Sequence, residues 1–293
     1  MSTPPTLTLP ACARAYPLET GRGRFAVHDA RPDGPVRGTA LLVPGFTGSK
    51  EDFIALLEPL AASGFRVVAV DGRGQHESPG PADPGAYTRE ELGRDVLAQA
   101  AALAGEDGGD GRRVHVLGHS LGGLVVREAV LRDAAPFASL TLMSSGPAAI
   151  AEAQRARTRM LLDALATLDM EAVWQAMRRL DPPEAPESAT PAEVREFLHR
   201  RWLNTRPEQL RATGRQLLDE PDRVAALAAV GLPVHVLSGE TDYAWPVPLM
   251  DAMAARLSAR RTVVEGAGHS PNAERPEDTA EALRAFWLGA GAG

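Results

Sequence analysis

The sequence predicts an α/β fold in which a mostly parallel sheet is covered by helices on both faces and interrupted by a helical insertion. Two observations support this prediction. Short apolar runs that end in glycine-rich loops alternate along the chain with segments of helical spacing, which is the pattern of parallel strands connected by helices. Between about residues 146 and 222 this alternation stops and only helical spacing remains. With 293 residues, 44% of them apolar, the chain can bury a core of this kind.

Strands are predicted where short apolar runs stand between turn residues. In chain order they are 24–28, 39–43, 65–70, 114–117, 139–143, 233–238 and 262–265. Helices are predicted at about 50–63, 88–103, 120–131, 247–256 and 276–288. Ser49 is a candidate helix cap, with Asp52 three residues later. Residues 1–23, which are rich in Pro, Thr and Gly, are predicted to be irregular.

The break in the alternation divides the chain into three parts. Residues 1–145 and 223–293 are predicted to form the two parts of a sheet-containing core, and residues 146–222 a helical cap inserted between them. Apolar side chains recur at helical spacing within the insertion, for example at Val194 and Phe197. We expect most of them to pack the inserted helices together rather than to contact a substrate.

Composition and charge narrow the range of partners. The net charge is −7, and lysine and arginine form no block outside the predicted helices of residues 152–215, which argues against nucleic acid and favours a small neutral or apolar molecule. Cys12 is the only cysteine, so neither an intrachain disulfide nor a thiolate metal cluster can form. The first 25 residues contain four prolines and no continuous apolar segment. We therefore expect no signal peptide, no membrane partner and a cytoplasmic location, while the oligomeric state stays open.

The most informative stretch is Gly118-His119-Ser120-Leu121-Gly122, which joins a predicted strand to a predicted helix. A Gly-x-Ser-x-Gly motif is common by chance, but between a buried strand and a helix it indicates a nucleophile elbow, a sharp turn that exposes the serine. The two glycines allow backbone segments to approach closely around such a turn. Ser120 is therefore predicted to be a nucleophile.

A serine hydroxyl needs an adjacent base, and seven histidines are available. His269 follows the last predicted strand in a Gly-x-Gly-His loop, from which its ring can reach the strand ends. His119 is too close to the serine in sequence and is expected to brace the turn through a hydrogen bond. His115 and His235 lie within predicted strands and are expected to be core residues. His269 is the predicted base.

The base in turn needs an acid that orients it, for which Asp242 is the candidate and Glu240 its competitor. The order Ser120, Asp242, His269 is that of the triad in the α/β-hydrolase fold. The chain resembles this superfamily, in particular its lid-bearing serine esterases, lysophospholipases and C–C hydrolases. Other motifs that carry the resemblance are Pro44-Gly45-Phe46, Asp71 to Ser78, Gly239 to Asp242 and Gly266 to His269.

The resemblance implies a mostly parallel eight-stranded sheet, an inserted helical cap and a reaction without cofactor or metal. It makes Ser120 the nucleophile, His269 the general base and Asp242 the orienting partner. The backbone N–H groups of Phe46 and Leu121 would form the oxyanion hole, where they would stabilise the negative charge that develops on the substrate oxygen.

Two positions depart from the superfamily pattern. The histidine that usually precedes the Gly-Phe pair is Pro44 here, which removes a donor but leaves the N–H of Phe46 in place. His76 stands where the loop after Asp71 usually has its second glycine. We expect His76 to be an exposed loop residue, the alternative being a role in shaping the pocket entrance. Asp71 and Arg73 are expected to brace the loop.

Together these features predict a serine hydrolase that forms an acyl-enzyme at Ser120 and acts on a small ester with an apolar acyl or alcohol part. Tentative pocket residues are Phe46, Trp174, Trp245 and Met250. The same triad could serve C–C bond hydrolysis or cofactor-free perhydrolysis, and the fold could serve as a ligand receptor or scaffold with little turnover. Haloalkane dehalogenases and epoxide hydrolases are disfavoured, because their nucleophile is Asp.

Overall fold

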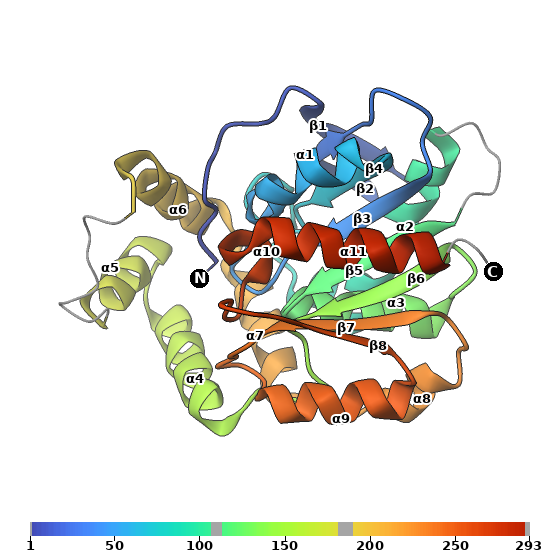
Figure 1. Cartoon of the computed structure of the whole chain (residues 1–293). Coiled ribbons are helices and arrows are strands. Elements are labelled where there is room, and N and C mark those ends of the chain that lie inside the picture. Colours follow the sequence, from blue (N-terminus) through green and yellow to red (C-terminus); the bar gives the residue numbers. More distant parts are fainter. Residues whose placement is uncertain (1, 107–112, 181–189, 291–293) are drawn as a thin grey trace.

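An eight-stranded sheet runs through the molecule (Figure 1). The computed structural model describes residues 2–106, 113–180 and 190–290. The strands are β1 (Ala13–Thr20), β2 (Gly23–Ala30), β3 (Gly38–Val43), β4 (Phe65–Val70), β5 (Val114–His119), β6 (Phe137–Met143), β7 (Val234–Gly239) and β8 (Arg260–Val264). They lie in the order β1-β2-β4-β3-β5-β6-β7-β8, and all neighbours from β4 to β8 are parallel. The antiparallel pairs are β1–β2 and β2–β4. The predicted mostly parallel sheet is therefore confirmed.

The N-terminal region corrects the sequence prediction. Residues 13–20, predicted to be irregular, form β1, which pairs with β2 along its whole length. β1 lies at the edge of the sheet, where Pro17 is tolerated because one side of an edge strand needs no hydrogen-bond partner. Leu18 is its only fully buried side chain. The strand therefore lacks the apolar pattern from which strands are predicted.

Side chains of the central strands alternate between two apolar cores, one on each face of the sheet. In β3, Leu41 and Val43 belong to one core, and Ala40 and Leu42 to the other, as the two-residue period of a strand requires. The helices over the first core are α2 (Arg89–Glu106), α3 (Leu121–Arg132), α8 (Val224–Ala228) and α9 (Val247–Leu257). Those over the second are α1 (Ile54–Ala62) and α11 (Pro276–Ala290).

The helix predicted at 50–63 begins as a single 3₁₀ turn, η1 (Lys50–Phe53), which α1 continues. Its start is capped as predicted, because Ser49 and Asp52 form a reciprocal capping box. Two further short elements follow later in the chain, η2 (Pro84–Tyr87) and α10 (Pro271–Glu274).

Between β6 and α8 the regular structure of the described residues is entirely helical. The helices are α4 (Glu152–Thr167), α5 (Met170–Leu180), α6 (Ala192–Asn204) and α7 (Pro207–Asp219). We call residues 146–222 the helical segment; α4, α5 and α6 extend away from the sheet at the left of Figure 1. A third apolar cluster packs these helices together, and consists of Leu165, Val173, Trp174, Trp202 and Leu210. None of the helices in the described ranges is long and apolar enough to cross a membrane.

A buried ion pair joins the helical segment to the core. Arg201 of α6 is 1% exposed and donates to Asp52 Oδ1 at 2.7 Å and to the carbonyl of Ser2 at 2.7 Å. Asp52 is fully buried, and this burial raises its pKa although Arg201 acts in the opposite direction. The carbonyl of Asp52 accepts from Asn272 of α10, the helix that follows His269. Through η1, the helical segment is thus connected to the loop that carries His269.

Candidate active site

Ser120 stands at the turn between β5 and α3. Its φ of 56° and ψ of −119° are values that a non-glycine residue adopts only under strain. Its N–H donates to the carbonyl of Met143 at 2.9 Å. The flanking glycines are needed as predicted, since a Cβ on Gly118 would lie 2.3 Å from the carbonyl of Gly122, and one on Gly122 would lie 2.3 Å from that of Val43. The expected sharp turn is therefore present.

Three polar side chains from separate loops form one hydrogen-bonded row. Ser120 Oγ lies 3.0 Å from His269 Nε2, and His269 Nδ1 lies 2.8 Å from Asp242 Oδ2. Because the carboxylate accepts a hydrogen bond from Nδ1–H, a ring with one proton presents Nε2 as an acceptor to the serine. Ser120 and His269 are each 8% exposed, and the Asp242 carboxyl group is fully buried. Such a row can move a proton from the hydroxyl to the imidazole and so activate the serine.

The loop after β7 decides which acid faces the histidine. The second oxygen of Asp242 accepts from two N–H groups of its own loop, at 2.7 and 3.0 Å. Glu240 instead accepts from the N–H of Gly266 at 3.1 Å. Of the two acids considered, Asp242 is the one that contacts His269.

Two residues hold the loop that carries His269. Glu274, which the sequence did not single out, accepts from the N–H groups of Gly268 and Ser270. His119 Nε2 lies 2.8 Å from the carbonyl oxygen of His269. Burial lowers the pKa of His119 to about 3, so its ring is neutral and its Nε2–H donates to that carbonyl. The sequence predicts that His119 forms a hydrogen bond that braces the turn at Ser120. The bond is present, and its acceptor lies in the loop that carries His269.

The two predicted oxyanion donors are backbone N–H groups beside the serine. Leu121 is the first residue of α3, so its N–H has no partner within the helix. In the loop after β3, a Cβ on Gly45 would lie 3.2 Å from Cβ of Ser120. The peptide between Gly45 and Phe46 is therefore next to the serine.

Gln75, which the sequence did not single out, orients this peptide. Its Nε2 donates to the carbonyl of Gly45 at 2.9 Å, and its Oε1 accepts from the N–H of Gly72 at 2.9 Å. Both halves of this buried amide are therefore satisfied. In a trans peptide the carbonyl and the following N–H point in opposite directions. The bond from Gln75 thus holds the N–H of Phe46 on the opposite side of the peptide.

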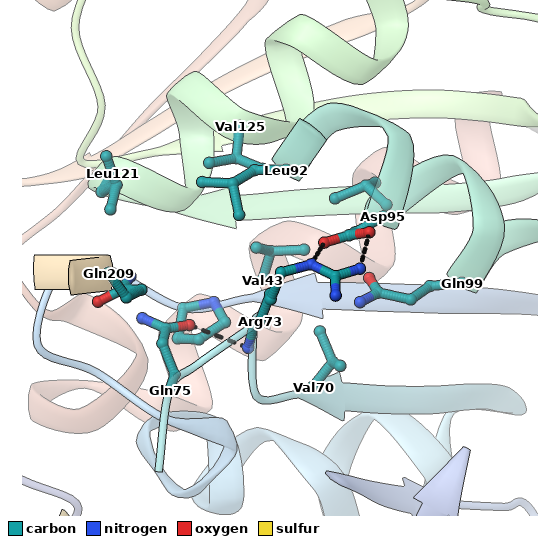
Figure 2. A pocket seen from close by; sticks show the side chains of 13 residues that line it. Val43, Val70, Arg73, Gln75, Leu92, Asp95, Gln99, Leu121, Val125 and Gln209 are labelled. Atoms are coloured by element: carbon teal, nitrogen blue, oxygen red, sulfur yellow. Dashed lines mark hydrogen bonds and ion pairs between the residues drawn. The ribbon is translucent and has the colours of Figure 1, made fainter. Parts of the chain in front are cut away.

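A cavity of about 30 Å³ is lined in part by Leu121 (Figure 2). Gln99 and Gln209 line it, each only 2% exposed, and their side-chain oxygens have no hydrogen-bond partner among the described residues. The volume is enough for about two water molecules, which could satisfy such amides. On one side, Arg73 donates to Asp95 at 2.6 Å, so Arg73 braces its loop as expected.

The four tentative pocket residues lie in different surroundings. Phe46 packs against both the first core and the third apolar cluster. Trp174 belongs to the third cluster and stacks on His199 at 5.2 Å. Trp245 and Met250 have no exposed area, and the indole of Trp245 donates to a backbone carbonyl at 2.8 Å. These last two are core residues and do not line an accessible pocket.

His76 lies against the helical segment. Its φ is 41°, its N–H donates to Thr205 Oγ1 at 3.3 Å, and its ring meets the edge of Phe197 at 5.4 Å. Because the side chain is only partly exposed, the expectation of an exposed loop residue is wrong. Pro44, the other departure from the superfamily pattern, is buried and lines the same cavity as Leu121.

In the described part of the chain, one group has the spacing of metal ligands, namely Glu51, His76 and Glu77, whose ligand atoms lie within 4.8 Å of one another. The Lys50 ammonium already lies there, 2.8 Å from Glu51, 3.0 Å from Asp71 and 2.6 Å from Glu77. These three acceptors match its three donors. Burial alone would lower the pKa of Lys50. The carboxylates have the larger effect, so the pKa is raised overall. The cluster is an ion-paired brace, which is the role expected of Asp71.

The two histidines expected in the core are there. His115 Nδ1 lies 2.8 Å from Ser139 Oγ, and His235 Nε2 lies 2.9 Å from Thr262 Oγ1. Burial lowers the pKa of His115 to about 4 and that of His235 to about 3. Both rings are therefore neutral core groups with a hydroxyl partner.

Comparison with known proteins agrees with this fold. Residues 40–282 match the model of the alpha/beta hydrolase family. Over 113 residues the chain is 37% identical to a proposed carbamate hydrolase, RutD, of Variovorax paradoxus (strain S110), and the match spans 38% of this chain and 40% of that protein. A thermophilic esterase of Thermogutta terrifontis is 24% identical with a TM-score of 0.72, over 95% of this chain and 100% of that one. A hydrolase of Pseudomonas aeruginosa PA01 is 26% identical with a TM-score of 0.73, over 94% and 98%.

Proposed function

The chain belongs to the alpha/beta hydrolase family, and we propose that it is a serine hydrolase that cleaves a small carboxylic ester through an acyl-enzyme at Ser120. One observation supports this above all others. A serine on a strained turn lies 3.0 Å from an imidazole nitrogen, and the other nitrogen of that ring lies 2.8 Å from a buried carboxylate. This is the arrangement that acyl transfer by a serine requires.

In the proposed reaction, Ser120 Oγ attacks the ester carbonyl carbon while His269 Nε2 takes the hydroxyl proton. Asp242 keeps the ring oriented and stabilises the imidazolium. The N–H groups of Leu121 and Phe46 donate to the oxyanion of the tetrahedral intermediate, and one such donor is typically worth about 10²–10³ in kcat. The imidazolium then protonates the leaving alcohol. A water deprotonated by His269 attacks the acyl-enzyme, and the acid leaves as Ser120 regains its proton.

We further propose that the helical segment is a cap over this site and that the substrate is small. Ser120 and His269 are each only 8% exposed, and Phe46 contacts the third apolar cluster of the segment. Tyr243 is 57% exposed, and its ring lies 4.6 Å from the His269 ring, so the entrance would pass beside it. Such an enclosed serine favours short acyl and alcohol groups.

Carbamates are the second candidate substrate class. The relative with 37% identity over 113 residues is a proposed carbamate hydrolase, and a carbamate carbonyl can be attacked by the same nucleophile with an amine as the leaving group. C–C bond hydrolysis and perhydrolysis would use the same row of side chains. A panel of short esters, carbamates and vinylogous diketones, with and without peroxide, separates these reactions.

The variant Ser120→Ala tests the proposal. We expect turnover of p-nitrophenyl butyrate to fall by roughly 10³–10⁶-fold, and covalent labelling by a fluorophosphonate to be lost. Ser145→Ala is the matched control, because Ser145 is a buried serine whose hydroxyl has no partner among the described residues. Full turnover or continued labelling of Ser120→Ala would refute the proposal. Labelling of the wild type without turnover of any substrate would indicate a ligand receptor instead.

A further inference from the structure

A groove on the helical segment combines arginine side chains with an apolar floor. It lies between α4 and α7 and has a volume of about 260 Å³. Its lining residues are Arg159, Leu162, Asp163 and Ala166 of α4, and Arg211, Arg215 and Leu218 of α7. In α4 the positions 159, 162, 163 and 166, and in α7 the positions 211, 215 and 218, recur at helical spacing, so each set occupies one helix face. The groove is therefore formed by two facing helix surfaces.

Positive charge exceeds negative charge in this groove. Arg211 is partly buried and Arg215 is exposed one turn later. Neither forms an ion pair or a side-chain hydrogen bond with any residue that the structure describes. Arg159 is paired on the surface with Glu152 at 3.1 Å. Asp163 is the single acid in the lining. Apart from the Arg159–Glu152 pair, the groove thus has two arginines and one acid, an excess of one positive charge in a chain whose net charge is −7.

The floor of the groove reaches toward the active-site loops. Leu218 is 9% exposed and Leu162 is partly buried. A Cβ on Gly214 of α7 would lie 2.8 Å from Leu162 and 3.1 Å from the ring of Phe46. Leu162 and Phe46 thus meet at the same glycine, and the groove is separated from the loop after β3 by a single layer of side chains.

We propose that this groove binds a small amphiphilic anion, a carboxylate or phosphate carried on a short apolar group. Guanidinium groups bind such oxyanions through charge-assisted hydrogen bonds, often in pairs. The apolar part would cover Leu162, Ala166 and Leu218. The volume is just below the range of about 300–1,000 Å³ that is usual for small-molecule pockets, which suits a headgroup with a few carbons. The site uses none of the residues of the hydrogen-bonded row and does not rest on the proposed ester hydrolysis.

Isothermal titration calorimetry of the full-length protein tests this site with hexanoate, hexyl phosphate, 1-hexanol and acetate. We expect saturable binding of at least one of the two six-carbon anions, which distinguishes a carboxylate from a phosphate headgroup. Hexanol should not bind, acetate should bind at least about tenfold more weakly, and binding should weaken as salt is added. The double variant R211Q/R215Q should lose at least about tenfold in affinity, and Asp163→Asn should bind more tightly.

The matched control is R200Q/R260Q, which removes the same charge from two exposed arginines outside the groove. It should bind like the wild type, and both double variants should melt like the wild type because all four side chains lie on or near the surface. Equal losses in the two double variants, binding of hexanol, or no saturable binding of either six-carbon anion would overturn the proposal. Acetate binding as tightly as hexanoate would also overturn it, because the apolar floor would then play no part.

Discussion

The sheet core and the helical segment are held in place by different interactions. In the core, the central strands are buried on both faces, and apolar side chains form two large clusters. The helical segment has one small cluster of its own, and its buried members of the first core are Ile150, Leu217 and Leu218. Polar contacts join it to the core: Arg201 binds Asp52, the N–H of Arg206 donates to the carbonyl of Gly74 at 2.8 Å, and Gln216 donates to a backbone carbonyl of η2 at 2.7 Å.

This difference shows which parts of the site are rigidly determined. Ser120, Asp242 and His269 follow the ends of three paired strands, β5, β7 and β8, of which β5 and β7 are fully buried. Their relative positions therefore follow from the register of the sheet. The position of the helical segment depends on fewer apolar contacts with the core and, in addition, on the polar contacts just named. A single substitution in one of these contacts should therefore loosen the segment and leave the sheet intact.

Arg201→Met should give the largest effect. It leaves the Asp52 carboxyl group buried without its partner, and breaking a buried ion pair in this way typically costs about 3–5 kcal/mol. Hydrogen exchange followed by mass spectrometry should show faster exchange in α6 and η1 and little change in β5 and β6. Uniform loss of protection across the sheet would contradict the separation of the two regions.

A second variant separates the ion pair from general damage. In D52N/R201M both charges are gone, and removing the second partner should restore part of the stability lost in Arg201→Met. Urea unfolding at pH 7.5 measures this coupling. Additive losses would mean that Arg201 acts by packing, for example against the Phe197 ring, which lies 5.5 Å from its guanidinium carbon.

Gln75→Met should have the next largest effect, because it removes the hydrogen bond that orients the peptide before Phe46. With the proposed ester as substrate, kcat should fall by about 10–100-fold, or roughly 1.4–2.7 kcal/mol, with little change in KM. Gln99→Met is the control, since this buried glutamine lines the same cavity and its side-chain oxygen has no partner among the described residues. Equal effects on kcat from both variants would show that only the packing of the cavity matters.

Acid should destabilise the core rather than the helical segment. Burial lowers the pKa of His28 and His115 to about 4, and that of His119 and His235 to about 3. Below about pH 6.5 the four histidines bind protons in the unfolded chain, whereas in the folded protein they stay neutral until the pH approaches their lowered pKa values. The contribution of these histidines to the free energy of unfolding is therefore complete above about pH 6.5. It is lost as the pH falls toward 4, by up to about 1.4 kcal/mol per pH unit for each histidine.

Urea unfolding between pH 7.5 and 5 measures this dependence. His235→Gln should reduce the slope of the unfolding free energy against pH by the contribution of one histidine, whatever the stability of the variant at pH 7.5. His199→Gln, in the helical segment, removes a partly exposed imidazole and is the surface control. A slope for His235→Gln identical to that of the wild type would contradict a neutral, buried His235.

Local patterns predicted the parts of the molecule in which burial dictates the residue type. The central strands could be predicted because they are buried on both faces and read as apolar runs. The turn at Ser120 could be predicted because Gly118 and Gly122 stand where the backbone leaves no room for a Cβ. β1 could not, because an edge strand with one fully buried side chain has no such pattern.

By itself, the sequence determined the α/β architecture and the positions of Ser120, Asp242 and His269 in the chain, because strand ends and glycine-rich loops are marked by local residue patterns. Only the tertiary structure decided which partners those loops meet. It selected Asp242 over Glu240, joined Gln75 to Gly45, and placed Trp245 and Met250 in the core. Such contacts connect residues far apart in the chain, and their geometry depends on sheet register and helix packing, which no local pattern encodes.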